Sequence, residues 1–252
     1  LQACADIVAR GDPDRFAAAM AAPVAARRVL FPLYAFNVEV ARAPWVASEP
    51  MIGEMRLQWW RDALEEIGEG RRVRAHEVTT PLAEVLDPDG AFTLDRLILA
   101  RRWDLYTEAF EDETHFDDYL SRTGGALMWT AARLLGAAQD VEVRVTAFGR
   151  ATALTRFLIA VPLLEARGRI PLVDGRSGPI AESARKTLTE ISGPTGLRRE
   201  LPASARPALI EGWQTRRLLR QISRDPGRVA KGNVGLSELG RRLLLLAASY
   251  RL

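Results

Sequence analysis

The acidic run at residues 111–118, EDETHFDD, has the residue types that a metal site requires. His115 with Glu111 or with Asp118 has the spacing of neighbours on one helix face, where an imidazole and a carboxylate can share a cation. Acidic side chains are also typical of an exposed helix N-terminus, because they complement the positive end of the helix dipole. We favour the helix N-terminus over the metal site.

Nucleophilic and phosphate-binding patterns are weak elsewhere in the sequence. Cys4 is the single cysteine, and with only two histidines to activate it a catalytic thiol is not expected. The glycines of GNVGLSELG, residues 232–240, lack the spacing of a phosphate-binding loop, and no Lys-Ser or Lys-Thr pair follows them. His76 is expected at the surface or as a capping residue.

The composition suits a soluble protein with a large core, since 48% of the 252 residues are hydrophobic and 27% are charged. Arginine outnumbers lysine 33 to 2, but the arginines are spread among acidic residues, so we expect no nucleic-acid partner. One cysteine excludes an internal disulfide and favours a cytoplasmic location. No apolar run reaches the ~18–20 residues of a membrane span, and no secretory signal is recognisable, although the chain begins without Met.

Apolar residues recur at helical spacing along nearly the whole chain, and no run alternates as a strand would. The sequence therefore predicts a single all-α domain over residues 1–252. Pro32 predicts a kink, and DPDG at 87–90 predicts a turn. One helix is expected to begin near Asp12 or Asp14. Further helices are expected over residues 24–42, 51–70, 76–87, 93–111, 114–136, 140–166, 179–192, 204–224 and 236–251.

Four segments carry a family resemblance: LFPLYAFNVEVAR, MIGEMRLQWWRDALEEI, FDDYLSRTGGALMWTAARLLG and LTRFLIAVPLLEARGRIPL. In this order and spacing they resemble squalene/phytoene synthases. The resemblance implies the isoprenoid-synthase fold, a helical bundle around a central apolar cavity. The helices that contain Asn37 and Leu158 are expected to face each other across it. Active members condense two prenyl diphosphates head to head, with Mg²⁺ held by two aspartate-rich motifs.

The aspartates of both motifs are missing from this chain. The first motif, DxxxD, falls on Ala41 and Trp45, and the acidic positions of the second fall on Ala160, Leu163 and Leu164. Mg²⁺ prefers carboxylate oxygens, and a departing diphosphate needs its charge compensated. These replacements predict that the usual two-motif mechanism is lost.

Nearby acidic residues do not restore the motifs. Glu39 is rotated about 160° from position 41 and Glu165 about 100° from position 164 on an ideal helix. Residues 143–164 contain no acidic side chain, and Pro162 is expected to interrupt the helix between the former ligand positions. We therefore expect no resident cofactor, with Mg²⁺ required only under the alternative of an active prenyltransferase.

The replacement pattern resembles the non-catalytic branch of the family, whose mitochondrial members assist assembly of respiratory complex I. Asn37 and Glu39, together with Arg56, Trp60 and Arg61, carry this resemblance. It implies an assembly or interaction factor with a protein partner, found in the cytoplasm of a bacterium or peripherally at the inner membrane. Two alternatives remain open: a head-to-head prenyltransferase with altered motifs, and a lipid carrier that uses the retained cavity for a prenyl or lipid ligand.

Several residues are candidates for the cavity or for a docking surface. Trp60 is either a core residue or a docking anchor beside Arg56 and Arg61. Asp104 is either a site residue or a structural carboxylate that pairs with Arg101. The final apolar segment, RRLLLLAASYRL, is either a core helix or an amphipathic face for an anionic membrane or a partner. The candidates are Tyr34, Asn37, Glu39, Arg56, Trp60, Arg61, Asp104 and Arg156.

Overall fold

The computed structural model describes residues 1–47, 49–191 and 194–250, and within these residues every regular element is a helix. The α-helices are α1 (Gln2–Gly11), α2 (Pro13–Ala21), α3 (Val24–Ala41), α4 (Ala43–Val46), α5 (Pro50–Gly68), α6 (Thr79–Ala83), α7 (Pro88–Arg101), α8 (Glu113–Leu120), α9 (Ala126–Leu134), α10 (Glu142–Glu165), α11 (Ser177–Glu190), α12 (Pro194–Glu200), α13 (Thr215–Arg224), α14 (Gly227–Ala230) and α15 (Glu238–Tyr250). Four short segments of other helical type are η1 (Arg102–Leu105), η2 (Ser121–Gly125), η3 (Gln139–Val141) and η4 (Arg206–Gly212). The all-α prediction is confirmed.

Helix α3 forms the centre of the core because its sequence from Leu30 to Val40 is almost entirely apolar. Tyr34 and Phe36 are among the largest fully buried side chains of the protein. Pro32 lies inside α3 without ending it. The helices α1, α2, α6 and α9 pack around α3, so few of its side chains reach solvent.

Helix α10 is the second long inner helix, and it corrects two expectations. Pro162 was expected to interrupt it, but α10 continues to Glu165, because a proline near a helix end removes one backbone hydrogen bond without breaking the packed face. Residues 139–165 are also long and apolar enough to cross a membrane by length and composition alone, contrary to the sequence expectation. Half of the tested window is buried inside the protein, as in a core helix.

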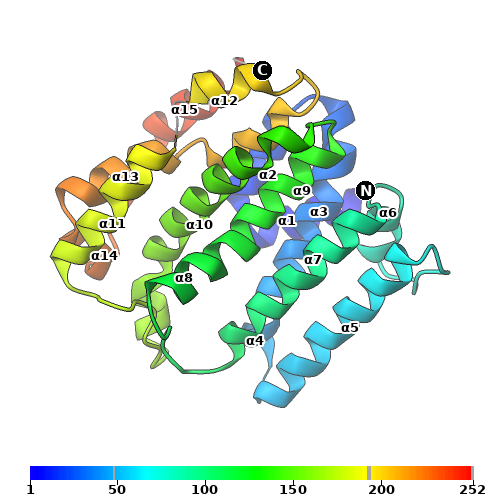
Figure 1. The fold of residues 1–252 in the computed structure, drawn as a ribbon, viewed down its shortest axis with the longest axis horizontal. Coiled ribbons are helices and arrows are strands. Elements are labelled where there is room, and N and C mark those ends of the chain that lie inside the picture. The colour runs from blue at the N-terminus through cyan, green and yellow to red at the C-terminus, as the bar shows by residue number, and fades with distance from the viewer. Residues whose placement is uncertain (48, 192–193, 251–252) are drawn as a thin grey trace.

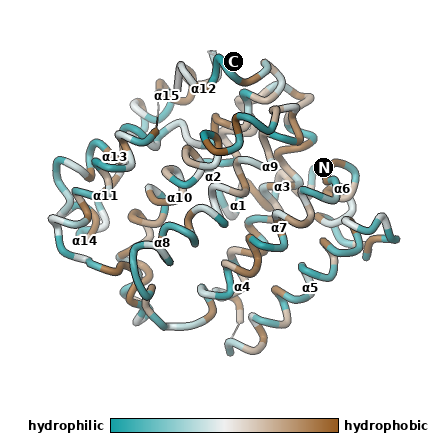
Figure 2. The backbone as a smooth tube through the Cα atoms, in the orientation of Figure 1, coloured by the Kyte–Doolittle hydropathy of each residue, from teal (hydrophilic) through white to brown (hydrophobic). Residues whose placement is uncertain are grey.

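The inner helices lie between two outer groups of helices (Figure 1). Helices α5 and α7 pack side by side at one end of the molecule, and α11 packs against α13 at the other. The hydrophobic residues concentrate along the middle of the molecule, whereas α5 at the edge is mostly hydrophilic (Figure 2). This arrangement leaves the ends of α3 and α10 on opposite sides of one pocket.

A π-helical turn joins α8 to α9, and it allows the chain to approach α10 closely. A Cβ atom at Gly149 of α10 would lie 2.6 Å from the carbonyl oxygen of Gly124 and 2.9 Å from the Cα of Gly125. Glycines are therefore required on both sides of this crossing. The predicted helix over 114–136 is confirmed as one continuous helical stretch that contains this turn.

Helix boundaries differ from the prediction mainly where short polar motifs act as caps. DPDG at 87–90 is not a free turn: Asp87 accepts a hydrogen bond from the backbone N–H of Gly90 (2.8 Å), and Pro88 begins α7. Asp12 caps α2 in the same way (2.9 Å to the N–H of Arg15). The expected helix over 204–224 divides into η4 and α13, and α1, α4, α12 and α14 were not predicted.

Candidate functional site

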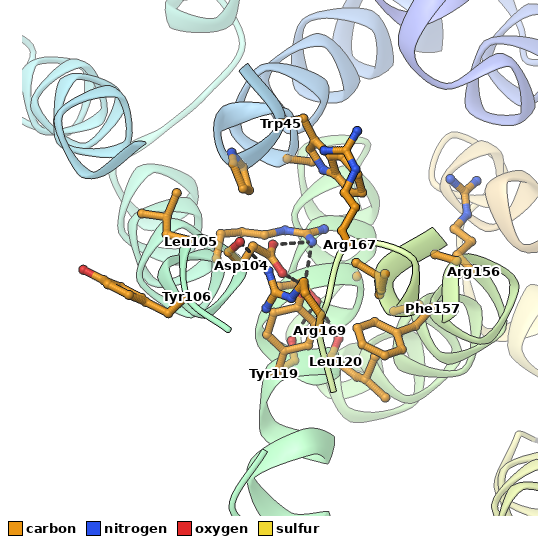
Figure 3. Close-up of a pocket in the computed structure, with 18 of the residues that line it drawn as sticks. Trp45, Asp104, Leu105, Tyr106, Tyr119, Leu120, Arg156, Phe157, Arg167 and Arg169 are labelled. Atoms are coloured by element: carbon orange, nitrogen blue, oxygen red, sulfur yellow. Dashed lines mark hydrogen bonds and ion pairs between the residues drawn. The ribbon is translucent and has the colours of Figure 1, made fainter. Parts of the chain in front are cut away.

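A pocket of about 360 Å³ opens between α4, η1, the α8–η2 segment and the second half of α10. Leu120 and Phe157 form an apolar wall, and Trp45 lies at the opposite side (Figure 3). A pocket therefore lies between the two motif helices, where a cavity was predicted, but its lining is not uniformly apolar. Five arginines also line it: Arg15, Arg101, Arg156, Arg167 and Arg169.

Four of the five positions where the family motifs carry acidic residues meet around this pocket. Ala41 and Trp45 lie on one side, and Ala160 and Leu164 lie on the other. The expectation that the α3 and α10 helices face each other across the cavity agrees with this lining. Leu163 is not a lining residue, and its side chain is 55% exposed.

Asp104, predicted as a cavity residue or a structural carboxylate, is both. It lines the pocket, forms an ion pair with Arg101 (3.0 Å) and accepts a hydrogen bond from the hydroxyl of Tyr119 (2.9 Å). Burial is the largest cause that raises the pKa of Tyr119, so this hydroxyl stays protonated and continues to donate. The carboxylate of Asp104 is thus held by two neighbours.

A second charged cluster includes two of the lining arginines and joins three segments of the chain. Arg15 of α2 pairs with Asp12 (2.7 Å) and with Glu211 of η4 (2.6 Å), and Arg156 of α10 pairs with Asp12 (2.5 Å). Burial by itself would raise the pKa of Asp12, but Arg15 and Arg156 outweigh it and lower that pKa to about 2. The cluster connects α2 to η4 through residues that are nearly two hundred positions apart in the sequence.

Tyr34, a predicted cavity residue, is fully buried beneath this cluster and does not line the pocket. The guanidinium carbon of Arg15 lies 5.7 Å from the centre of its ring. The hydroxyl of Tyr34 and one carboxylate oxygen of Glu211 are buried with no hydrogen-bond partner among the described residues. Burial raises the pKa of Tyr34 well above its usual value, so the phenol is neutral.

Two further arginines are held over tryptophan rings. The guanidinium carbon of Arg167 lies 4.0 Å from the centre of the Trp45 ring, and that of Arg169 lies 4.2 Å from the centre of the Trp103 ring. Arg169 also donates to the backbone carbonyls of Trp103 and Asp104. The sequence analysis missed both residues, although the alternating arginines of EARGRI directly follow the second motif.

The lining does not fit the Mg²⁺ ions that the synthase fold implies. Across residues 1–47, 49–191 and 194–250, no group of three or more His, Cys, Asp or Glu side chains is placed to hold a metal ion. Asp104 is the single carboxylate that lines the pocket in this part of the chain, and it is already paired with Arg101. Surrounding arginines would repel a divalent cation.

Trp60 is a core residue, so its interpretation as a docking anchor is wrong. Its ring is 5% exposed and packs edge-on against Phe36, Trp59 and His76 at centroid distances of 5.0–5.5 Å. It points inward because α5 turns this face toward α3. His76 accepts a hydrogen bond from the N–H of Val78, but α6 has no side-chain cap, so His76 does not cap this helix.

The remaining candidates do not meet in one site. Asn37 is buried, Glu39 pairs with Arg42 (2.8 Å), and Arg61 pairs with Asp95 of α7 (2.6 Å). Arg56 is exposed on α5. Because none of these four lines the pocket, a shared cavity role for them is wrong, and only Asp104 and Arg156 keep it.

Two sequence ambiguities are resolved by the contacts. Asp112 caps α8 by accepting from the N–H of His115 (2.8 Å), which confirms that EDETHFDD begins a helix. Helix α15 packs on α2 and η4 but leaves an apolar stripe in solvent, so it is not a fully buried core helix, and contact of this stripe with a membrane or a partner stays a prediction. The stripe consists of Leu239, Leu243, Leu246 and Tyr250.

Comparisons with known proteins agree with this geometry. The squalene/phytoene synthase family model matches residues 8–173. A Drosophila melanogaster protein named NADH dehydrogenase (ubiquinone) complex I, assembly factor 6 homolog is 29% identical over 168 residues, which are 64% of this chain and 50% of that protein. The mouse and human assembly factor 6 proteins are 25% and 23% identical over 181 residues, covering 66% of this chain and 51% of each. The chain thus spans about half the length of these relatives.

A solved structure of a dehydrosqualene synthase in complex with ligand has the same fold. The two structures superpose with a TM-score of 0.76, covering 99% of this chain and 95% of the synthase, at 17% sequence identity. At this identity the match establishes the architecture and leaves the activity to the site residues.

Proposed function

The chain belongs to the squalene/phytoene synthase family, and from this premise we propose that it is a catalytically silent member that acts as an assembly factor for respiratory complex I. The observation that carries the proposal is the replacement of motif carboxylates by Ala41, Trp45, Ala160 and Leu164 around an arginine-rich pocket. The similarity to three proteins named as complex I assembly factors supports the proposed role in assembly.

The proposed loss of prenyl-transfer activity follows from the charge that develops in the transition state. Ionisation of a prenyl diphosphate places negative charge on the leaving group, and metal ions normally supply several kcal/mol of compensation there. Each 1.36 kcal/mol changes a rate tenfold, so loss of the metal ligands reduces turnover by several orders of magnitude. The pocket then serves as a binding site for a prenyl or lipid ligand and not as an active site.

The first experiment measures pyrophosphate release from farnesyl and geranylgeranyl diphosphate in Mg²⁺. We expect no release above a heat-killed sample, while an active synthase assayed in parallel releases pyrophosphate. Release by this protein above the heat-killed control would instead support the alternative, a head-to-head prenyltransferase with altered motifs.

We propose that the protein partner contacts the start of α5, where Met51 and Met55 are 72% and 68% exposed. Exposed apolar patches of this kind mark interaction surfaces. Together with the apolar stripe of α15, they also support the proposal of a cytoplasmic protein that contacts the inner membrane peripherally.

The second experiment is affinity capture of the tagged protein from its own organism, with complex I subunits quantified. We expect these subunits to be enriched, and enrichment to fall when Met51→Glu and Met55→Glu are combined. Val143→Glu, at an 80% exposed position on α10, is the matched control and should leave enrichment unchanged. Equal recovery of complex I subunits with an unrelated tagged protein would end the assembly-factor proposal.

A further inference from the structure

The charge of the chain is divided unevenly along the sequence. Residues 197–252 contain 12 Arg and Lys residues against 4 Asp and Glu, whereas residues 1–196 contain 23 against 28. The last quarter is therefore strongly basic, although the whole chain has a net charge of only +3. Such an asymmetry is typical of a region that meets an anionic partner. This region also lies beyond residues 8–173, which the family model matches.

Helix α13 presents three arginines to solvent on one face. Arg217, Arg220 and Arg224 have the spacing i, i+3 and i+7, which places them together on a helix surface. All three are exposed, and in the part of the chain that the structure describes none of them forms an ion pair. The opposite face of α13 packs against α10 and α11. We call these three residues the arginine row.

The carboxylates of the last quarter are already engaged elsewhere. Each of its four acidic residues pairs with an arginine outside the row: Glu200 with Arg144, Glu211 with Arg15, Asp225 with Arg228 and Glu238 with Arg242. The three charges of the arginine row are therefore open to an anion from outside the chain.

Helix α15 keeps its apolar stripe in solvent because its other face is fastened to the rest of the protein. Arg241 pairs with Asp14 of α2 (2.5 Å), and its guanidinium carbon lies 6.0 Å from the centre of the Trp213 ring. Near the other end of α15, the carbonyl of Ala248 accepts a hydrogen bond from Arg198 (3.1 Å). The stripe cannot turn inward without breaking these contacts.

The arginine row and the apolar stripe lie on one side of the molecule. The side-chain amide of Gln221, one turn from two members of the row, exchanges two hydrogen bonds with the backbone of Gly235 (2.9 and 3.1 Å). Together with the contact of Arg241 and Trp213, these bonds place the start of α15 beside α13. Both helices lie along the edge of the molecule opposite α5 (Figure 1).

We propose that the arginine row and the apolar stripe of α15 together dock the protein on an anionic lipid bilayer. An amphipathic helix is held on such a bilayer by apolar side chains at the boundary of headgroups and acyl chains, and by cations beside the lipid phosphates. The stripe alone would fit a protein partner equally well, but the unneutralised row beside it favours the lipid surface. The proposal deepens the peripheral membrane contact proposed above, because it names the surface and the lipid charge.

The test is sedimentation of the purified whole protein with vesicles of phosphatidylcholine, alone or mixed with phosphatidylglycerol. We expect sedimentation with the mixed vesicles only, and we expect added salt to weaken it because salt screens the arginines. Sedimentation with neither kind of vesicle, or equal sedimentation with both, would overturn the proposal.

Charge variants locate the arginine row. Arg217→Gln, Arg220→Gln and Arg224→Gln combined should weaken vesicle binding on the order of a hundredfold, about fivefold for each arginine removed. The matched control makes the same change of charge at three exposed arginines without ion pairs in the described chain: Arg28→Gln, Arg56→Gln and Arg72→Gln. The control should bind as the wild type does. Equal binding by the two triple variants would contradict the assignment.

A second pair of variants tests the apolar stripe. Leu246 is 64% exposed in the stripe, and Phe92 is 65% exposed on α7, so neither substitution creates a cavity in the core. Leu246→Ser should weaken vesicle binding about tenfold, because a buried leucine side chain is lost from the bilayer. Phe92→Ser should leave it unchanged. Unchanged binding by Leu246→Ser would remove the stripe from the docking surface.

A nucleic acid is the other polyanion that an arginine row fits. Binding of duplex DNA that the triple variant of the row abolishes, without sedimentation on mixed vesicles, would overturn the membrane proposal in favour of a nucleic acid. The sedimentation contains no complex I subunit and no prenyl diphosphate. Its failure would therefore leave the proposed assembly role and the proposed loss of catalysis standing, and their failure would leave the membrane surface standing.

Discussion

At the scale of single residues, the sequence located the motif positions but not the chemistry that replaced them. Ala41, Trp45, Ala160 and Leu164 meet around the pocket as expected from their place in the motifs. Arg156 was predicted as a cavity residue, but Arg15 and Arg101 were not, because they come from helices far from either motif in the sequence. The sequence also left the place of Trp60 undecided, because helical spacing alone does not show which face of α5 is buried.

Asp12 gives the sharpest prediction at this scale. Its pKa is lowered to about 2, against about 3.9 in an unfolded chain, so the ionised carboxylate contributes about 2.6 kcal/mol of stability above pH 5. Asp12→Asn keeps a helix-capping oxygen but removes the charge, and should lower the free energy of unfolding by this amount at pH 7.

The pH dependence supplies the check on Asp12. Because the folded pKa is depressed, the stabilisation is present above the unfolded pKa and is lost as pH falls from about 4 toward 2. Urea unfolding should therefore give wild-type and Asp12→Asn curves that converge as pH falls through this window. Asp118→Asn, which removes an exposed pair with Arg122, serves as control and should change stability little. Parallel curves for Asp12→Asn would contradict the assignment.

At the scale of elements, long periodic helices were predicted well, and short or capped ones were not. The segment over 140–166 became α10 almost unchanged, because it is long and apolar residues recur along its whole length. Helices α4 and α12 have only 4 and 7 residues, too few for a periodic pattern to emerge. The start of α7 was misplaced because Asp-Pro is a signal shared by turns and helix caps.

The close contact between η2 and α10 predicts that one methyl group added at Gly149 lowers the stability of the protein. Gly149→Ala would press a Cβ into the backbone of Gly124 and Gly125, and should destabilise the protein by about 1–3 kcal/mol. Gly178→Ala in α11, where no atom lies within 4 Å of the added Cβ, should be neutral or slightly stabilising. Thermal unfolding of both variants tests this, and equal midpoints would mean that the crossing is loose.

At the scale of the whole molecule, the described residues share one hydrophobic core that includes both Cys4 and Ala248. Polar contacts also join distant parts of the chain, as in the pairs of Arg15 with Glu211 and of Asp14 with Arg241. The all-α class was predictable from periodicity. The way the last quarter of the chain closes against α2 was not, because its contacts are made by residues far apart in sequence.

We therefore predict that residues 1–252 unfold as one domain. Far-ultraviolet circular dichroism and tryptophan fluorescence should report a single coincident transition in urea, because helices at both ends of the chain depend on the same core. Two separated transitions, with the C-terminal helices lost first, would show that the chain contains two independent units.

The stacking of Arg167 on Trp45 has a consequence for the history of the protein. A single step back, Trp45→Asp, would set the new carboxylate beside Arg167, and the two would pair with each other instead of coordinating a metal. Ala160→Asp alone would restore one carboxylate with no second one on the facing helix. If the protein is catalytically silent as proposed, neither single substitution sets two carboxylates on facing helices, so we expect that a return to a metal site needs at least two substitutions together.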